Sequence, residues 1–251
     1  MIYFVGAGSG APDLITVRGA RLLSEADVIV YAGSLVNPAL LDYKKDGCEV
    51  YNSAKMTLEE VIAVMAPAAK AGKTVVRLHT GDPCVYGAHR EQMDELDRLG
   101  LAYEVCPGVS SFCGAAAALK AEYTLPNVSQ SVILTRMEGR TPVPEKEQIE
   151  SFAAHGATMV IFLSAGQLAR LSERLIAGGY APDTPAAIVY KATWPDEKVV
   201  RTTVADLAEA GVREGITKTA LITVGGFLGT GYERSKLYDP TFTTEFREAS
   251  R

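Results

Sequence analysis

The sequence predicts an α/β protein made of two consecutive α/β domains. Short runs rich in β-branched residues alternate with segments of helical periodicity along almost the whole chain. The 251 residues are 47% hydrophobic and 22% charged, which suits a soluble protein with one large or two smaller cores. The alternation lapses around 122–130, so we place the boundary there and expect domains at 1–121 and 122–251.

The elements of the first half follow from local signals. Val28 to Tyr31 is apolar on both faces, as a strand inside a parallel sheet requires. Thr57 and Glu60 form a capping box for a helix that ends at Gly72. The other expected strands are 2–5, 74–79 and 103–106, and the other expected helices are 14–23, 88–99 and 110–120.

The second half repeats the alternation without an internal repeat or a low-complexity linker. Tyr232 to Arg251 is polar and interrupted by proline, which is typical of a peripheral tail. The expected strands are 131–135, 158–163, 186–190, 197–203 and 219–224, and the expected helices are 145–154, 166–177 and 204–214.

Charge and cysteine content exclude several classes of protein. A formal net charge of −5 gives no overall field for nucleic acid or anionic lipid. Neither a signal peptide nor a membrane-spanning apolar stretch is evident, so we expect a cytoplasmic protein. The four cysteines have no C-x-x-C pair and only three histidines accompany them, so we expect neither a metal site nor disulfides.

The opening turn, Gly6 to Ala11, fits the G-x-G-x-x-G/A pattern of dinucleotide enzymes. Pro12 and Asp13 delay the helix that should start on such a turn, and no acidic residue follows the second strand. Dinucleotide binding is therefore disfavoured. Two interpretations remain: a tight strand-to-helix connection, or glycines that let a large ligand approach the backbone.

Two further turns also follow strands. Gly81 and Pro83 shape the second turn, where Asp82 either accepts hydrogen bonds from amides or a ligand, or caps the next helix. Gly108 lies in the third turn, and for Ser110 a helix N-cap role is favoured locally. Together the three turns outline a pocket that would bind a ligand by its polar edges.

Five segments resemble the tetrapyrrole methylases in order and spacing, up to about Val224. These are VGAGSGAPDLITVRGARLL, LHTGDPCVYG, VCPGVSS, MVIFLSA and TALITVG. The resemblance implies a homodimer of two-domain α/β chains that transfers a methyl group from S-adenosylmethionine, held between the domains, to a tetrapyrrole carbon. After the methyl group is transferred, the donor leaves as S-adenosylhomocysteine.

The resemblance also implies site residues. Gly8 and Ser9, in the opening turn, border the trough for the tetrapyrrole; many relatives have proline where Ser9 stands. Leu163 occupies a position where some relatives carry methionine. The implied donor contacts are Pro12, Thr80, Gly81, Asp82, Ser110, Ser111, Leu163, Ala192 and Ala220.

A tetrapyrrole acceptor bears carboxylates, so we predict that nearby cations pair with them. Arg140, in a turn rich in glycine and proline, is the strongest candidate, although a solvated surface role is equally open for each cation. His79, Asp82 and Tyr86 lie near the donor turn, but none carries the signature of a general base, and the catalytic residues stay unassigned. The predicted acceptor-binding cations are Arg18, Arg77, Arg136, Arg140 and Lys191.

Three other segments, at 31–41, 135–145 and 190–203, resemble the branch of precorrin-4 C(11)-methyltransferases in cobalamin synthesis. This branch implies precorrin-4 or cobalt-precorrin-4 as the acceptor and carbon 11 as the methylated atom. The alternatives are another branch such as uroporphyrinogen-III methylation, a nicotinamide oxidoreductase, a relative acting on RNA or protein, and a corrinoid carrier without catalysis. Trp194 could contact a macrocycle or a partner subunit, with core packing as the default.

Overall fold

The computed structural model describes residues 1–250, which form two compact units. The first unit comprises Met1–Ala115 together with Ala192–Asp196, and the second comprises Ala116–Lys191 and the chain from Glu197 onward. The main division falls between Ala115 and Ala116, whereas the expected boundary was 121/122. The short segment Ala192–Asp196 departs from the expectation, because its contacts place it with the first unit.

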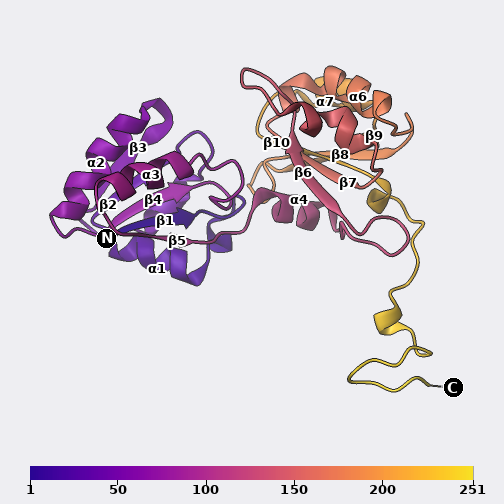
Figure 1. The fold of residues 1–251 in the computed structure, drawn as a ribbon, viewed down its shortest axis with the longest axis horizontal. Helices are drawn as coiled ribbons and strands as arrows, with labels where there is room; N and C mark the ends of the chain where they lie inside the picture. Colours follow the sequence, from indigo (N-terminus) through magenta and orange to yellow (C-terminus); the bar gives the residue numbers. More distant parts are fainter. Residues whose placement is uncertain (251) are drawn as a thin grey trace. The chain divides into compact units, whose positions relative to one another are not determined.

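The first unit contains a five-stranded sheet in the order β3-β2-β4-β1-β5 (Figure 1). Every neighbouring pair is parallel, so the carboxyl ends of the strands share one edge. The strands are β1 (Ile2–Gly6), β2 (Val28–Tyr31), β3 (Glu49–Asn52), β4 (Val75–His79) and β5 (Tyr103–Cys106).

Helices cover both faces of this sheet, as Figure 1 shows. On one face, Leu22 and Leu23 of α1 (Val17–Glu25) pack against Ile29 and Leu78. On the other face, α2 (Leu58–Lys70) and α3 (Arg90–Arg98) bury their apolar sides against β1, β2 and β4. This two-faced burial explains why the central strands β1 and β2 are apolar on both faces.

Local signals account for most element ends in this unit. The capping box is confirmed, since the Glu60 N–H donates to Thr57 Oγ1 and the Thr57 N–H donates to the Glu60 carboxylate. The helix expected at 14–23 is instead a 3₁₀ turn, Pro12–Leu14, followed by α1. The Thr16 side chain caps α1 by accepting from the Gly19 N–H.

The second unit contains a mixed sheet in the order β6-β7-β10-β8-β9. Strands β6 and β7 are parallel, and the other neighbouring pairs are antiparallel. The strands are β6 (Val132–Arg136), β7 (Thr158–Phe162), β8 (Pro185–Tyr190), β9 (Lys198–Thr203) and β10 (Ala220–Val224). All five expected strands are confirmed to within a residue at either end.

Three helices bury their apolar sides in one core against this sheet. They are α5 (Ile149–Ala153), α6 (Leu168–Ala177) and α7 (Leu207–Glu214). The helix expected at 145–154 is divided into a 3₁₀ turn, Glu145–Glu147, and α5. The helix α4 (Ser111–Leu119) contains the boundary between the two units.

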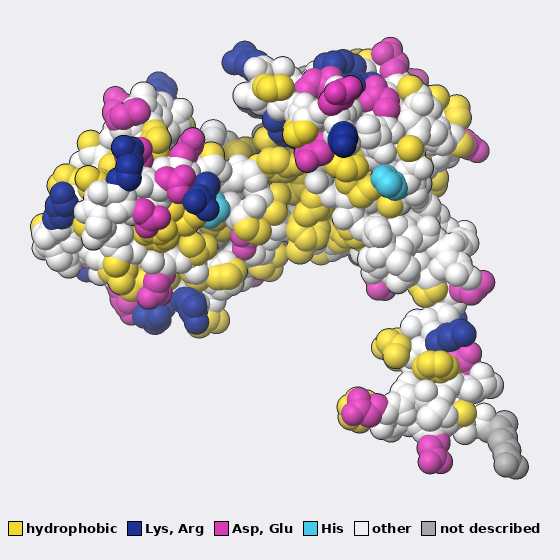
Figure 2. Space-filling model, in the orientation of Figure 1, with side chains coloured by type: hydrophobic (Ala, Val, Ile, Leu, Met, Phe, Trp, Pro, Cys, Tyr) yellow, Lys and Arg dark blue, Asp and Glu magenta, His cyan; other side chains and the backbone are white. Residues whose placement is uncertain are grey.

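The surface carries mixed charge. Figure 2 shows Lys and Arg interspersed with Asp and Glu on the visible face, in keeping with the net charge of −5. Residues 230–250 are mostly exposed and contain a 3₁₀ turn at Lys236–Tyr238. No helix in residues 1–250 has the length and apolar character that crossing a membrane requires.

Candidate functional site

Three glycines meet at the carboxyl edge of the first sheet. β1 lies between β4 and β5, and Gly6, Gly81 and Gly108 lie at or just after the ends of these strands. A Cβ on Gly6 would lie 2.6 Å from Gly108 Cα, and one on Gly108 would lie 2.2 Å from the Gly81 carbonyl oxygen. The glycines therefore allow the turns to approach one another, which a side chain would prevent.

The opening turn is hydrogen-bonded to the second turn. The Gly8 N–H donates to the Gly81 carbonyl at 3.2 Å, and the Gly81 N–H donates to the Gly8 carbonyl at 2.9 Å. A phosphate cradle needs free amides at a helix start, whereas the Gly8 amide is used within the chain and α1 begins only at Val17. The opening turn is thus not built as a dinucleotide-binding turn.

Asp82 joins the second turn to the third. Its Oδ1 accepts from the Cys84 N–H and its Oδ2 accepts from the Gly108 N–H, both at 2.8 Å. Burial raises the pKa of Asp82, but the Cys84 side chain, these backbone hydrogen bonds and the nearby His89 outweigh it and hold the pKa below its usual value. Asp82 does not cap the next helix, because α3 begins at Arg90. The edge therefore carries an ionised carboxylate at neutral pH.

The other predicted donor contacts of the first unit lie in these turns. Pro12 opens the 3₁₀ turn after the glycines, and Thr80 is half-buried between β4 and Gly81. A Cβ on Gly81 would lie 3.3 Å from the Ser111 amide nitrogen, so the second and third turns are in contact there. Ser110 is 7% exposed, and its carbonyl accepts from the Cys113 N–H at the start of α4.

The segment Ala192–Asp196 lies against the opening turn. Thr193 Oγ1 lies 3.1 Å from Ser9 Oγ and accepts from the Ala11 N–H at 3.0 Å. A Cβ on Gly10 would lie 2.2 Å from the ring of Trp194. Trp194 therefore packs on Gly10. Ala192, a predicted donor contact, is buried and belongs to the first unit, as do the donor contacts in the three turns.

Two residues that hold the opening turn were not predicted from the sequence. They are Thr193 and Asn37, whose Nδ2 donates to the Gly10 carbonyl at 2.9 Å. Both lie in segments that resemble the precorrin-4 branch, at 190–203 and 31–41. That correspondence is the sequence signal that could have found them.

In the second unit, Leu163 and Ala220 lie at one end of the sheet. β10 is antiparallel to β7 and β8, with Ile222 opposite Ile161 and Ala220 opposite Tyr190. Continuing the β7 register places Leu163 beside Ala220. Leu163 is 64% exposed with φ of +53°. Lys191 and Thr219 also have positive φ. Backbone strain of this kind is typical of functional sites.

The loop after β6 presents Arg140. The Arg136 guanidinium donates to the carbonyls of Met137, Thr141 and Pro142, so it organises its own loop. The Met137 N–H donates to Ser164 Oγ, the residue after Leu163. Arg140 is exposed on a loop fixed from β6 and lies at the same end of the sheet as Leu163.

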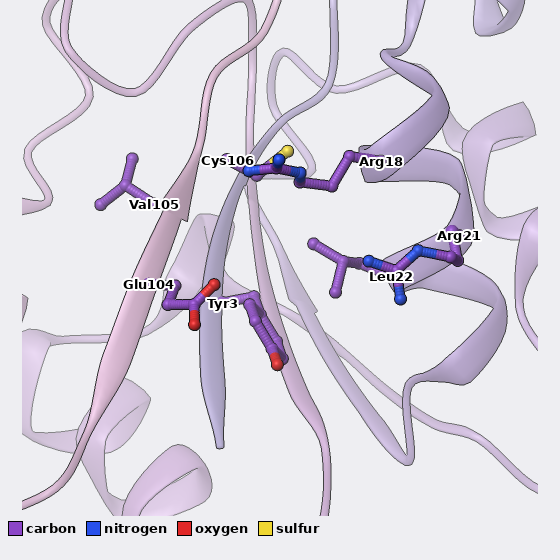
Figure 3. Close-up of a pocket in the computed structure, with 7 residues that line it drawn as sticks. All are labelled: Tyr3, Arg18, Arg21, Leu22, Glu104, Val105 and Cys106. Carbon is purple, nitrogen blue, oxygen red and sulfur yellow. The ribbon is translucent and has the colours of Figure 1, made fainter.

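Arg18 and Arg77 occupy different surroundings. Arg18 lines a pocket with Tyr3, Glu104 and Cys106, and Figure 3 shows its guanidinium extending from α1 toward the strand that carries Cys106. Arg77 is only 6% exposed and donates to Gln92 and to the Val30 carbonyl. The structure contradicts the expected pairing of Arg77 with ligand carboxylates, because its guanidinium lies inside the first unit.

Comparison with protein families gives one match across most of the chain. The model of the tetrapyrrole (corrin/porphyrin) methylases matches residues 1–208. The chain belongs to this family.

Relatives of this tetrapyrrole methylase span all or nearly all of its length. A cobalt-precorrin-4 C(11)-methyltransferase of Methanocaldococcus jannaschii is 55% identical, over 100% of this chain and 97% of the relative. A precorrin-4 C(11)-methyltransferase of Mycobacterium tuberculosis is 46% identical, over 94% of this chain and 95% of the relative.

Solved structures give the same family. The X-ray structure of a cobalt precorrin-4 methyltransferase has a TM-score of 0.89 at 51% identity, covering 91% of this chain and 96% of the other. A uroporphyrin-III C-methyltransferase from Thermus thermophilus, complexed with S-adenosylhomocysteine, has a TM-score of 0.76 at 29% identity, covering 90% of this chain and 98% of the other.

The candidate bases differ in accessibility within this methylase. His79 is 3% exposed, and burial, with the nearby Arg77 and His89, lowers its pKa to about 3. Both oxygens of Asp82 accept backbone hydrogen bonds. Tyr86 is 45% exposed and has φ of +54°. Neither His79 nor Asp82 is arranged as a general base.

No cluster of His, Cys, Asp and Glu fit for a metal occurs in the described residues.

Proposed function

We propose that this chain is an S-adenosylmethionine-dependent methyltransferase that methylates carbon 11 of cobalt-precorrin-4 and gives cobalt-precorrin-5 in cobalamin biosynthesis. Its membership of the tetrapyrrole methylases supports the reaction class. The 55% and 51% identity to cobalt-precorrin-4 enzymes, against 46% to a precorrin-4 enzyme, supports the cobalt-containing acceptor.

The single structural observation that carries the proposal is the junction of three strand-end turns around Asp82. Ligands of open α/β sheets bind outside the carboxyl ends of the strands, where these turns lie. The ionised group held there is a carboxylate, which suits a cationic sulfonium and opposes a pyrophosphate. The residues present at the junction therefore fit S-adenosylmethionine.

The donor supplies a methyl group on a positively charged sulfur. The bond between the methyl carbon and the sulfur breaks as a bond between the methyl carbon and carbon 11 forms, and the acceptor releases a proton. The chain's own residues align the reactants and exclude water, which is worth on the order of 7–11 kcal/mol in well-oriented reactions. The rigid contact among Gly6, Gly81 and Gly108 supplies that preorganisation in the first unit.

The proposed site residues are those that the family resemblance implies. Gly8 and Ser9 border the acceptor. Its carboxylates pair with Arg18, Arg140 and Lys191, and each arginine can form two parallel hydrogen bonds to one carboxylate. Arg136 acts indirectly by fixing the loop of Arg140. The donor contacts are Pro12, Thr80, Gly81, Asp82, Ser110, Ser111, Leu163, Ala192 and Ala220.

The reaction is tested by product analysis. The purified chain is incubated with labelled S-adenosylmethionine and with precorrin-4, its cobalt complex or uroporphyrinogen III. Mass spectrometry then counts the methyl groups added, and NMR locates the labelled carbon. Label at carbon 11 of the cobalt complex supports the proposal; label only on uroporphyrinogen III, or binding without turnover, contradicts it.

Two further features belong to the same proposal. The family resemblance supports a homodimer, and light scattering of the eluted protein should give twice the chain mass of 26.8 kDa. A cytoplasmic location is consistent with soluble corrinoid chemistry. Fractionation of cells that express the tagged full chain should recover it with cytoplasmic marker enzymes.

A further inference from the structure

Two buried polar side chains lie on one face of β4. Arg77 and His79 are two positions apart, so they point to the same side of the strand. They are 6% and 3% exposed, and the ring of Phe4 lies 5.9 Å from that of His79. A guanidinium in such surroundings is costly unless its donors are satisfied.

Within residues 1–250, the hydrogen bonds of Arg77 go to neutral acceptors. Its Nε donates to Gln92 Oε1 at 3.0 Å, and its Nη1 donates to the Val30 carbonyl at 3.2 Å. Burial lowers the pKa of Arg77 to about 10, so the side chain stays charged at neutral pH. Maintaining a buried cation that has no carboxylate partner in the described part of the chain requires a reason beyond packing.

That reason lies in what the two side chains hold. Gln92, fixed by Arg77, donates from Nε2 to the Ala88 carbonyl at 2.9 Å. The backbone of Gly87 faces the His79 imidazole and favours its protonated form, which opposes the lowering of the His79 pKa by burial. Ala88 is therefore anchored to α3 by a hydrogen bond, and its neighbour Gly87 lies against the His79 ring of β4.

The anchored segment is strained. Tyr86 and Ala88 have φ of +54° and +47°, in the left-handed region that side chains disfavour. A Cβ on Gly87 would lie 2.1 Å from the Pro83 carbonyl oxygen, so the turn is closed on itself. Such strain persists only where surrounding contacts over-determine the backbone.

We propose that His79 and Gln92, the latter held by Arg77, are positioning residues that fix the turn Thr80–Ala88 for donor binding. Asp82 holds one end of this turn through Cys84 and Gly108. His79 and Gln92 hold the other end at Gly87 and Ala88. This inference rests on the proposed function, since it treats Thr80, Gly81 and Asp82 as donor contacts.

The decisive variant is Gln92→Glu. It keeps an oxygen acceptor for Arg77 and gives that cation a charge partner, but it replaces the N–H donor to Ala88 with a second acceptor. We expect the melting temperature to stay within a few degrees of wild type. The Kd for S-adenosylhomocysteine should rise about tenfold, which corresponds to 1.4 kcal/mol.

The matched control is Gln148→Glu in the second unit. Gln148 Oε1 accepts from Arg174 Nη2 at 2.6 Å, so the substitution also places a carboxylate beside an arginine. Its Kd for S-adenosylhomocysteine should equal that of wild type. His79→Phe is a second variant that keeps a ring against Phe4 and removes the imidazole nitrogens that face Gly87; its Kd should also rise.

Amide hydrogen exchange gives a readout besides affinity. In unliganded Gln92→Glu, peptides that cover 82–89 should exchange faster than in wild type, while those covering β4 should not. Faster exchange with a raised Kd and a retained melting temperature supports the positioning role. If both Gln92→Glu and His79→Phe have the same Kd and the same exchange rates as wild type, the positioning role is overturned. It is also overturned if Gln148→Glu loses as much affinity as Gln92→Glu. Absence of S-adenosylhomocysteine binding by wild type overturns the proposed function, and the inference with it.

Discussion

Asp82 and Gly108 are joined by a 2.8 Å hydrogen bond from the Gly108 N–H to Asp82 Oδ2, across 26 positions of sequence. The bond fastens the second strand-end turn to the third. It makes one carboxylate responsible for the relative position of two predicted donor-binding segments, since its other oxygen holds the Cys84 N–H.

Asp82→Ala should weaken both folding and donor binding. Hydrogen bonds to a charged group contribute about 1.5–3 kcal/mol, so we expect the free energy of unfolding to fall by roughly that amount. Urea denaturation measures this loss, and titration with S-adenosylhomocysteine measures the accompanying rise in Kd. Asp42→Ala, on an exposed position, is the control. Equal behaviour of the two variants would refute the role of Asp82.

Gly108→Ala should destabilise the junction of the three turns. The new methyl group would lie 2.2 Å from the Gly81 carbonyl oxygen and 2.7 Å from Gly6 Cα, and both are backbone atoms that cannot rotate away. Overpacking of this kind costs about 1–3 kcal/mol, read from the denaturation midpoint. Gly231→Ala, where a Cβ meets nothing within 4 Å, should leave the midpoint unchanged. A stable Gly108→Ala protein would show that the turns do not require this contact.

Trp194 is the only tryptophan, so its fluorescence reports on the opening turn. Gly10→Ala would place a methyl group 2.2 Å from its ring, and the ring must move. We expect a shifted emission maximum in Gly10→Ala and an unshifted one in Gly231→Ala. Identical spectra for wild type and Gly10→Ala would mean that Trp194 does not pack there in solution.

The pH dependence of stability should contain a contribution from His79. Its pKa is lowered in the folded chain to about 3, so below about pH 6.5 the unfolded chain binds the proton and the folded chain does not. Acid therefore favours unfolding, and from pH 7 to pH 5 this group removes about 2 kcal/mol of stability. When the free energy of unfolding of His79→Phe is measured by denaturation from pH 7 to pH 5, it should fall by about 2 kcal/mol less than that of wild type. A parallel profile in the variant would contradict the buried, neutral imidazole.

Arg140→Ala should raise the acceptor's KM and leave donor affinity nearly unchanged. Loss of one arginine–carboxylate pair is worth about 1.5–3 kcal/mol, which is roughly a tenfold to hundredfold change. Arg90→Ala, which removes an exposed arginine of α3, should have no such effect. Initial rates at varied acceptor concentration measure the change. A defect confined to donor binding would contradict the role of Arg140.

The sequence predicts the strand-end turns well because their signals are local. β2 and β5 begin and end where expected, since glycine or proline closely follows each run of strand-forming residues. β3 was missed because it is a short edge strand of half-exposed and polar residues, without the apolar run of the central strands. The existence of three turns at one edge follows from parallel topology, and the adjacency of β4, β1 and β5 confirms it.

Long-range contacts could not be predicted in this way. Ser9 and Thr193 are 184 positions apart, and no periodicity connects them. The burial of Arg77 was also unexpected, because arginine is ordinarily exposed and its satisfaction depends on Gln92 in a different element. The reason for the glycines was visible only in three dimensions, where backbone meets backbone.

Calorimetric titration of the purified chain with S-adenosylhomocysteine, alongside Asp82→Ala, tests the central claim most directly. The account predicts saturable binding to the wild type and a clearly weaker interaction with the variant, both proteins being folded by circular dichroism. A folded wild-type protein that produces no binding heat, together with no protection by S-adenosylhomocysteine against thermal unfolding, would contradict it.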